Sequence, residues 1–258
     1  MKLKKINSSK DDLKLSFELQ DSNEAFANTI RRMVIEEVPT LAVEDVEVKD
    51  NSSALYDEML ALRLGLTPIK TDLSSYSLPK NQDEIEERSA SCTLQLSLKS
   101  SKKGYVYAES AQSKDPKCTF VFPKMPVAKL VSKQKIDVNM WAVMGQGKDH
   151  IKWSPGLVWY SRSADIKINN DSKMFEECKS KYPSQIFDNK GKISKDKILE
   201  LNLVDAVDRV CNDVVKVSYS ENDFIFNVES WGQLSCNEML SESAEMLAKK
   251  ADELNSLL

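Results

Sequence analysis

A helix pattern that runs directly into a strand pattern, within residues 26–48, constrains this chain more than any other feature. Asp21 and Glu24 have the D-x-x-E spacing of a capping box, so we expect the helix to begin beside them. Pro39 lacks the backbone N–H that a helix interior needs, so we expect the helix to end before it. A helix and strand joined in this way are suited to docking and not to chemistry. The apolar face, at spacings of three and four residues, is predicted to consist of Phe26, Ile30, Met33 and Val34.

Two adjacent arginines, Arg31 and Arg32, lie on this predicted helix. Neighbouring residues of a helix are about 100° apart, so at least one guanidinium group must point away from the apolar face. Two interpretations stay open. The pair is either a solvated helix face, as most helix charges are, or a contact to carboxylates or carbonyl groups of a partner.

The carboxy-terminal segment predicts a second amphipathic helix. Ser235 and Glu238 have the spacing of a capping box, and apolar residues follow at alternating steps of four and three. The stripe covers either a sheet of the same chain or a partner, and the sequence does not choose between them. Its members are Leu240, Ala244, Leu247, Ala251, Leu254 and Leu258.

Several segments alternate apolar and polar residues, which predicts half-buried strands within residues 13–19, 92–98 and 136–144. Residues 215–219 and 224–228 also alternate. The polar residues 220–223 between them predict a hairpin with a four-residue turn.

Bulk composition excludes some functions. Lysine and arginine number 36 against 40 for aspartate and glutamate, which gives a net charge of -4 and a pI near 5.3. A chain with this net negative charge has no overall electrostatic attraction for the phosphate backbone of DNA, so we expect no direct sequence-specific DNA binding. No apolar run approaches the about 18 residues that span a bilayer, and the lysine-rich start lacks a signal-peptide core. We therefore expect a cytoplasmic protein with no membrane contact.

The five cysteines are odd in number and widely spaced, so neither a disulfide framework nor a zinc knuckle is indicated. Reduced, mostly buried thiols are the default expectation. The five are Cys92, Cys118, Cys178, Cys211 and Cys236.

No catalytic constellation is found. Residues 145–148, Gly-Gln-Gly-Lys, resemble a phosphate-binding loop, but Ala142 and Asp149 occupy positions that require glycine and a hydroxyl residue. His150 is the only histidine, and we expect it to serve a turn or contact a partner. The acidic pairs at 36–37, 44–45 and 86–87 lack a metal-binding pattern. They are either solvated charges or acceptors for basic groups of partners.

Four blocks, in this order along the chain, resemble the D subunit of archaeal DNA-directed RNA polymerase: residues 26–48, 55–71, 147–156 and 224–234. This family is equivalent to the third-largest subunit of eukaryotic polymerases and to the amino-terminal domain of bacterial alpha. One departure is that members commonly read A-H-R-L-G where this chain has Ala-Leu-Arg-Leu-Gly at 61–65. Any role of a histidine at that position is thereby put in doubt.

The resemblance implies an α+β fold with a discontinuous alpha-like dimerisation domain, formed by residues 1–40 plus 212–258. An inserted mostly β domain would span residues 41–168, and a small degenerate ferredoxin-like insert residues 169–211. The final helix is expected to lie against the helix of residues 26–34.

The resemblance also implies a noncatalytic assembly scaffold within a nucleotidyltransferase complex, DNA-directed RNA polymerase. The family member pairs with the small subunit L, and this heterodimer is the docking platform for the second-largest subunit; the small subunits N and P are further expected partners. Arg31 and Arg32 are assigned to the contact with the second-largest subunit. The heterodimer interface is assigned to Phe26, Ile30, Met33, Val34, Leu240, Leu247, Ala251 and Leu254.

Some members hold an iron-sulfur cluster through C-x2-C-x2-C-x3-C. Counting back from Cys211 at this spacing gives Val207, Val204 and Leu201, none of which offers a ligand. We therefore expect no cofactor and predict that these four residues share one helix face as a small core. The alternative function is a stand-alone iron-sulfur or nucleotide-binding enzyme. The missing cysteines and the failed phosphate loop count against it.

Overall fold

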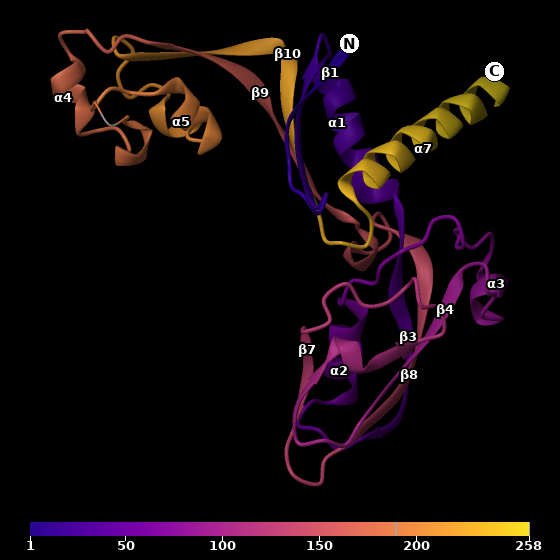
Figure 1. The fold of residues 1–258 in the computed structure, drawn as a ribbon. Coiled ribbons are helices and arrows are strands. Elements are labelled where there is room, and N and C mark those ends of the chain that lie inside the picture. Colours follow the sequence, from indigo (N-terminus) through magenta and orange to yellow (C-terminus); the bar gives the residue numbers. More distant parts are fainter. Residues whose placement is uncertain (189, 258) are drawn as a thin grey trace. The chain divides into compact units, whose positions relative to one another are not determined.

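The computed structural model describes residues 1–188 and 190–257 and confirms the predicted α+β class (Figure 1). The chain divides into two compact units. The first unit consists of Met1–Lys4, Glu18–Glu24 and Tyr160–Ile225. The second unit consists of Lys5–Phe17, Ala25–Trp159 and Phe226–Leu258.

One four-stranded sheet has the order β1-β2-β10-β9. Its strands are β1 (Lys2–Ser8), β2 (Lys14–Gln20), β10 (Val215–Ser230) and β9 (Gly156–Ile168). The alternation of residues 13–19 is confirmed, because Leu15, Phe17 and Leu19 are buried. Within the second unit, the ring of Phe17 stacks on that of Phe226, with centroids 5.1 Å apart.

The predicted hairpin of residues 215–228 is wrong, because β10 runs through it as one continuous strand. Residues 220–223 contain neither glycine nor proline, so nothing in the backbone forces a reversal. The backbone oxygen of Asn222 accepts a hydrogen bond from the N–H of Ser22 at 2.8 Å, which keeps this polar segment in an extended pairing. The Ser220 hydroxyl donates to the carboxylate of Asp223 at 2.8 Å instead of closing a turn.

The second unit contains a four-stranded sheet of order β3-β8-β4-β6. Helix α2 (Asp57–Gly65) lies against β3 and buries Leu60 and Leu64 in a core with Leu41, Val43 and Met140. The polar segment 73–91 is largely exposed and contains the short helix α3 (Gln82–Glu86). The strands are β3 (Pro39–Asn51), β8 (Ile136–Gln146), β4 (Thr93–Ser100) and β6 (Ala111–Ser113), and a separate two-stranded sheet pairs β5 (Gly104–Tyr107) with β7 (Pro126–Leu130).

Helix α1 (Glu24–Arg32) continues into a π-helical turn, η1 (Met33–Glu37), before β3 begins at Pro39. The predicted helix end before Pro39 is thus confirmed. Helix α7 (Cys236–Leu257) packs against η1 within the second unit. Its capping box is also confirmed, since the Ser235 N–H donates to the Glu238 carboxylate at 2.8 Å and the Glu238 N–H donates to the Ser235 hydroxyl at 3.3 Å. Leu258, the last member of the predicted stripe, lies outside the described residues.

Between β9 and β10, the described residues form short helices around their own apolar cluster. The prediction that Leu201, Val204, Val207 and Cys211 share one helix face is wrong. Helix α5 ends at Glu200 and α6 covers only Val204–Val207, because Asn202 between them adopts a φ of +51°. Leu201 is consequently 50% exposed, whereas Val207 is fully buried. The helices are α4 (Phe175–Lys179), the 3-10 turn η4 (Ser184–Ile186), α5 (Lys195–Glu200) and α6 (Val204–Val207).

Hydrophobic packing holds this helical segment together. The buried cluster includes Phe175, Tyr182, Ile186 and Ile198. The predicted domain boundaries themselves stay a prediction. Strand β9, which the predicted boundary at residue 168 would assign to the middle domain, lies next to β10 in the sheet order and not next to β8.

Candidate functional site

The four motif blocks meet at the beginning of β3, within the second unit. The hydroxyl of Thr40 donates to the backbone oxygen of Trp153 at 2.7 Å. The N–H of Leu41 donates to the Thr71 hydroxyl at 3.0 Å, and the N–H of Thr71 donates to the backbone oxygen of Gln233 at 2.9 Å. Each of these bonds joins segments that are far apart in sequence, so residues of all four blocks form one connected junction. We refer to Thr40, Thr71, Trp153 and Gln233 as the junction.

The two glycines in the segment that resembles a phosphate-binding loop, Gly145 and Gly147, allow close packing at this junction. A Cβ atom on Gly147 would lie 2.0 Å from the backbone oxygen of Ile35 in η1. A Cβ on Gly145 would lie 2.4 Å from the indole of Trp153, whose N–H donates to the Val143 backbone oxygen at 3.0 Å. The backbone of this segment therefore lies directly against the Ile35 backbone at Gly147 and against the Trp153 ring at Gly145. Both positions require glycine, because a Cβ atom does not fit at either.

Glu37 is the electrostatic centre where η1, α7 and residues 146–148 meet. Its carboxylate lies 2.5 Å from the ammonium of Lys250 and 3.3 Å from that of Lys148. The Gln146 amide donates to the backbone oxygen of Glu37 at 2.7 Å. Burial acts to raise the pKa of Glu37, but the hydrogen bonds from Lys250 and Lys148 outweigh it and hold the pKa below its ordinary value. The sequence offered Glu37 only as half of an acidic pair, so its role was missed.

The residues assigned to a heterodimer interface lie in two different environments. Val34 is fully buried and Met33 is 7% exposed, so both belong to the chain's own core. The switch from α1 to the π-helical turn at Met33 changes the angular step between side chains, which a regular helix pattern did not anticipate. Phe26 and Ile30 are half-buried, as are Leu240 and Leu247, while Ala251 and Leu254 are exposed. The interface assignment itself stays a prediction.

Both arginines of α1 have partners on their own helix. The Arg31 guanidinium donates to the Asn28 side-chain oxygen at 3.0 and 3.1 Å. Arg32 forms a two-pronged pair with Glu36, with distances of 2.9 to 3.2 Å, and this pair lowers the pKa of the Glu36 carboxyl. Arg32 is exposed and Arg31 is half-buried, so the assignment of this pair to a large partner subunit stays a prediction.

His150 serves a turn, as one of the two sequence interpretations predicted. Its Nδ1 accepts a hydrogen bond from the N–H of Lys152 at 3.1 Å and so caps the 3-10 turn η3 (Ile151–Trp153). The imidazole also meets the Trp153 indole edge to face, with centroids 6.3 Å apart. The geometry gives His150 a structural role.

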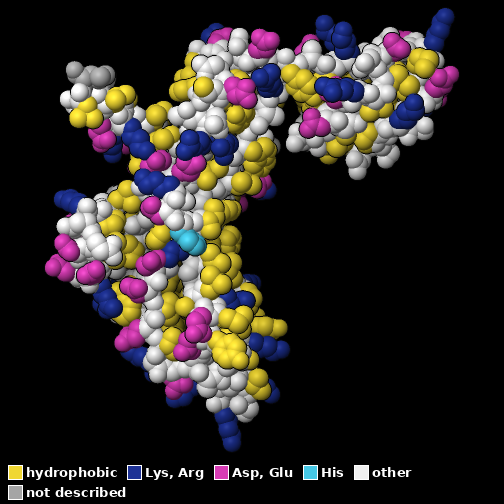
Figure 2. Space-filling model, turned by 180° about the vertical axis from the view of Figure 1, so that it is seen from behind, with side chains coloured by type: hydrophobic (Ala, Val, Ile, Leu, Met, Phe, Trp, Pro, Cys, Tyr) yellow, Lys and Arg dark blue, Asp and Glu magenta, His cyan; other side chains and the backbone are white. Residues whose placement is uncertain are grey.

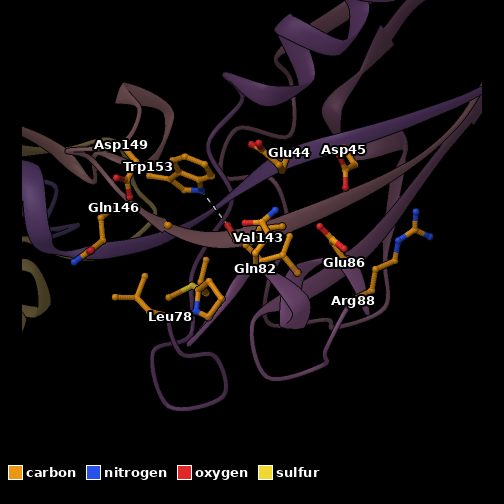
Figure 3. A pocket seen from close by; sticks show the side chains of 14 residues that line it. Glu44, Asp45, Leu78, Gln82, Glu86, Arg88, Val143, Gln146, Asp149 and Trp153 are labelled. Atoms are coloured by element: carbon orange, nitrogen blue, oxygen red, sulfur yellow. Dashed lines mark hydrogen bonds between the residues drawn. The ribbon is translucent and has the colours of Figure 1, made fainter.

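Acidic side chains from distant segments line a hollow of about 650 Å³ on the second unit (Figure 3). Figure 3 shows the carboxylates of Asp45 on β3 and Glu86 on α3 pointing toward one another. Glu44 and Asp149 also line the hollow, and the Lys152 ammonium pairs with Glu44. The sequence presented Glu44, Asp45 and Glu86 as members of two separate pairs, and only the fold of segment 73–91 brings Glu86 beside β3. Both interpretations of these acidic pairs stay open: solvated charges, or acceptors for basic groups of a partner.

Nothing in residues 1–188 and 190–257 groups three or more histidine, cysteine or acidic side chains in a way that could hold a metal ion. Cys178 and the half-buried Cys211 share the cluster of the helical segment, and the hydrogen bond between their thiols raises the pKa of Cys178. The expectation of no cofactor stays a prediction. Among the same residues, no helix combines the length and hydrophobicity that crossing a lipid bilayer requires.

Comparison with known proteins agrees with this geometry. The family described as the RNA polymerase Rpb3/Rpb11 dimerisation domain matches residues 16–251, a range that contains all four blocks of the junction. This chain belongs to that family. The matched region includes η1 and most of α7, as far as residue 251.

Relatives within the Rpb3/Rpb11 family are similar along nearly their whole length. A protein of Methanosarcina acetivorans named DNA-directed RNA polymerase subunit Rpo3 is 32% identical over 253 residues, which cover 96% of this chain and 95% of the relative. A protein of the same name from Pyrococcus furiosus is 32% identical over 261 residues, with 95% and 92% covered. Rpo3 is the D subunit of the archaeal polymerase, so the resemblance found in the sequence is confirmed.

Proposed function

We propose that this chain is a noncatalytic scaffold subunit of DNA-directed RNA polymerase and forms a heterodimer with the small alpha-like subunit L. The observation that carries the proposal is the match of a dimerisation family to residues 16–251, in a chain whose α7 leaves Ala251, Leu254 and Leu257 exposed. The relatives named as polymerase subunits support the same role.

The surface of α7 supports the pairing. None of its described residues after Ser243 is fully buried, and Leu254 and Leu257 are 59% and 83% exposed. A helix gains most of its stability from packing an apolar face, so a long stretch of uncovered helix favours a partner. Leu240 and Leu247 of the same helix are half-buried. Together with Phe26 and Ile30 they offer an apolar surface of the kind that obligate dimers bury.

Further parts of the proposal follow from the family. The second-largest polymerase subunit would dock on the heterodimer through Arg31 and Arg32, and the small subunits N and P would join the same cytoplasmic assembly. The chain would contribute neither catalytic residues nor an iron-sulfur cluster. No observation on the described residues favours the alternative of a stand-alone iron-sulfur or nucleotide-binding enzyme.

Mixing the purified chain with a purified small alpha-like subunit tests the pairing. We expect the two to elute together from a size-exclusion column with the mass of a one-to-one complex, at micromolar concentration. Two separate peaks at the masses of the free proteins would contradict the proposed function. An unrelated small acidic protein, added in place of the alpha-like subunit, provides the control for nonspecific association.

A further inference from the structure

The two-stranded sheet of β5 and β7, in the second unit, has one face toward the core and one toward solvent. Val106, Ala128 and Leu130 belong to the buried core cluster of this unit. Successive side chains of a strand point to opposite faces, so Tyr105 and Tyr107 project from the outer face of β5. They are 57% and 36% exposed. The outer face therefore presents two large aromatic rings to solvent.

These two rings form an aromatic strip with a lysine beside it. The centroids of the Tyr105 and Tyr107 rings are 6.1 Å apart, and the ring planes differ by 36°. Lys129 lies opposite Tyr105 in the strand pairing, and its ammonium is 5.1 Å from the centroid of that ring. A nucleobase can stack on an exposed ring while the phosphate next to it contacts a neighbouring ammonium.

Lysine is concentrated around the aromatic strip. Residues 101–107 and 122–135 contain six lysines and neither aspartate nor glutamate, although the whole chain has a net charge of -4. Lys135 pairs with Asp50 at 2.5 Å. In the part of the chain that the structure describes, no carboxylate pairs with the other five, all of which are exposed: Lys102, Lys103, Lys124, Lys129 and Lys133. The chain itself thus leaves this local positive charge without a counter-charge.

The strand register places lysines at both ends of the strip. Gly104 lies opposite Leu130, so the connections at 101–103 and 131–133, with three of the lysines, are at one end. Tyr107 lies opposite Pro126, so Lys124 is near the other end. Figure 2 shows basic and hydrophobic side chains together at the lower right, on the side of the second unit that carries β7 in Figure 1. Rings flanked by ammonium groups suit an extended polyanion that carries stacking groups.

The strip is held in place before any ligand binds. The guanidinium of Arg63 on α2 donates to the backbone oxygens of Pro126 and Val127 at 2.7 and 2.8 Å, which fixes the outer edge of β7. The N–H of Ala108 donates to the backbone oxygen of Met125 at 2.9 Å and extends the pairing beyond Tyr107. Little ordering of the protein is therefore needed on binding.

We propose that the outer face of β5 and β7 binds single-stranded nucleic acid, with Tyr105 and Tyr107 stacking on bases and the surrounding lysines contacting phosphates. Every base has a π face, so such a site reads no particular sequence. The positive charge also attracts duplexes and acidic peptides, but neither offers unpaired bases to the two rings. The inference goes beyond the proposed function, since α1 and α7 contribute no residue to this face.

Fluorescence anisotropy of labelled oligonucleotides, mixed with the full chain, tests the site. We expect oligo(U) and oligo(dT) of about twelve nucleotides to bind with micromolar affinity in about 50 mM salt. A duplex of the same length should bind at least about tenfold more weakly, because its bases are already stacked. Three to four phosphate contacts predict that the logarithm of the association constant falls with that of the salt concentration at a slope of about −2 to −3. The ratio of the two affinities identifies RNA or DNA as the preferred strand.

Two sets of variants separate stacking from charge. Tyr105→Leu combined with Tyr107→Leu removes both rings and should weaken binding about tenfold or more, whereas Tyr105→Phe combined with Tyr107→Phe keeps the rings and should bind like wild type. Lys103→Gln combined with Lys129→Gln removes two phosphate contacts and should make the salt slope less steep by about 1.4.

Matched controls lie on the first unit. Tyr219→Leu removes a tyrosine of similar exposure, 41%, and Lys167→Gln combined with Lys216→Gln removes two exposed lysines. Both should bind like wild type. Circular dichroism checks that each variant is folded. If the leucine variant unfolds, the phenylalanine and glutamine variants still decide, because weakened binding by the former or an unchanged salt slope in the latter would overturn the inference.

Three other results would also overturn it: duplex binding as tight as single-strand binding, wild-type affinity in the folded leucine variant, or equal displacement of the oligonucleotide by oligo-glutamate of the same charge. The last of these would assign the face to acidic peptides. The measurement needs no partner subunit. A chain that binds single strands but fails to pair with the small alpha-like subunit would therefore contradict the proposed function and leave this inference standing.

Discussion

The ammonium of Lys250 lies 2.5 Å from a carboxylate oxygen of Glu37, which joins the carboxy-terminal helix to the turn that follows the first helix. The two residues are separated by most of the chain. Lys148 approaches the same carboxylate at 3.3 Å. The Glu37 side chain, which is 13% exposed, therefore pairs with lysines from two separate segments. This contact lies where α7 leaves η1 and continues as an uncovered helix.

The first prediction concerns the pH dependence of this contact. Because the folded-state pKa of Glu37 is lower than its ordinary value of 4.5, its contribution is fully present above that value and is lost as the pH falls through the lowered pKa. We expect the difference in unfolding temperature between wild type and Glu37→Gln to be constant above about pH 5 and to shrink in more acidic solution. Calorimetric scans at a series of pH values measure it. A difference that grows on acidification would contradict the assignment.

The second prediction concerns close packing at Gly147. Gly147→Ala places a Cβ against the rigid backbone of Ile35, so we expect a loss of about 1–3 kcal/mol in the free energy of unfolding. Gly65→Ala is the matched control, because its Cβ would lie 3.4 Å from the Val43 oxygen and alanine favours a helix. Urea unfolding of both variants compares them. Equal stabilities would show that the Ile35 segment moves aside freely.

The third prediction concerns the heterodimer. Ile30→Asp combined with Leu247→Asp places charges on two half-buried positions of the proposed interface, and we expect a loss of several kcal/mol in binding, on the order of 3. Co-purification with the small alpha-like subunit measures the loss. Circular dichroism of the free variant checks that the chain still folds. Leu199→Asp, at an exposed leucine of α5, is the control and should co-purify normally. Wild-type yield from the double variant would rule out this interface.

The fourth prediction concerns Arg31 and Arg32. Replacing both with alanine should leave the heterodimer intact and block recruitment of the second-largest subunit, since truncating an interfacial charge pair typically costs about 2–5 kcal/mol. Stepwise reconstitution separates the two events. The intrahelical bonds of Arg31 to Asn28 and of Arg32 to Glu36 provide the competing explanation. If the double variant assembles active polymerase at normal subunit concentrations, the pair is a solvated helix face.

The fifth prediction concerns the helical segment after β9. Leu201, Val204 and Val207 supply no thiolate, so anaerobically purified protein should be colourless and free of stoichiometric iron and acid-labile sulfide. Metal analysis and the visible absorption spectrum test this. Cluster absorption accompanied by stoichiometric iron would contradict it, because Cys178 and Cys211 would then have to bind with ligands from elsewhere.

Local patterns in the sequence were sufficient for several elements. The capping box at Ser235, the helix end before Pro39 and the alternation through Leu15, Phe17 and Leu19 depend on residues close together in the chain. The sequence also carried the family, because the four blocks keep their order. The capping box, the helix end and the alternation are determined by neighbours within a few residues, which a single sequence displays directly.

Other features depended on contacts across the chain. The polar residues 220–223 stay in an extended strand because Ser22 pairs with Asn222, and Leu201 is exposed because the chain turns at Asn202. The π-helical turn buries Val34 in the core. Glu37 gains its role only from Lys148 and Lys250, which lie more than a hundred residues away along the chain. Local spacing therefore determined the elements and the family, whereas long-range packing and hydrogen bonding decided which side chains are buried, paired or left at the surface.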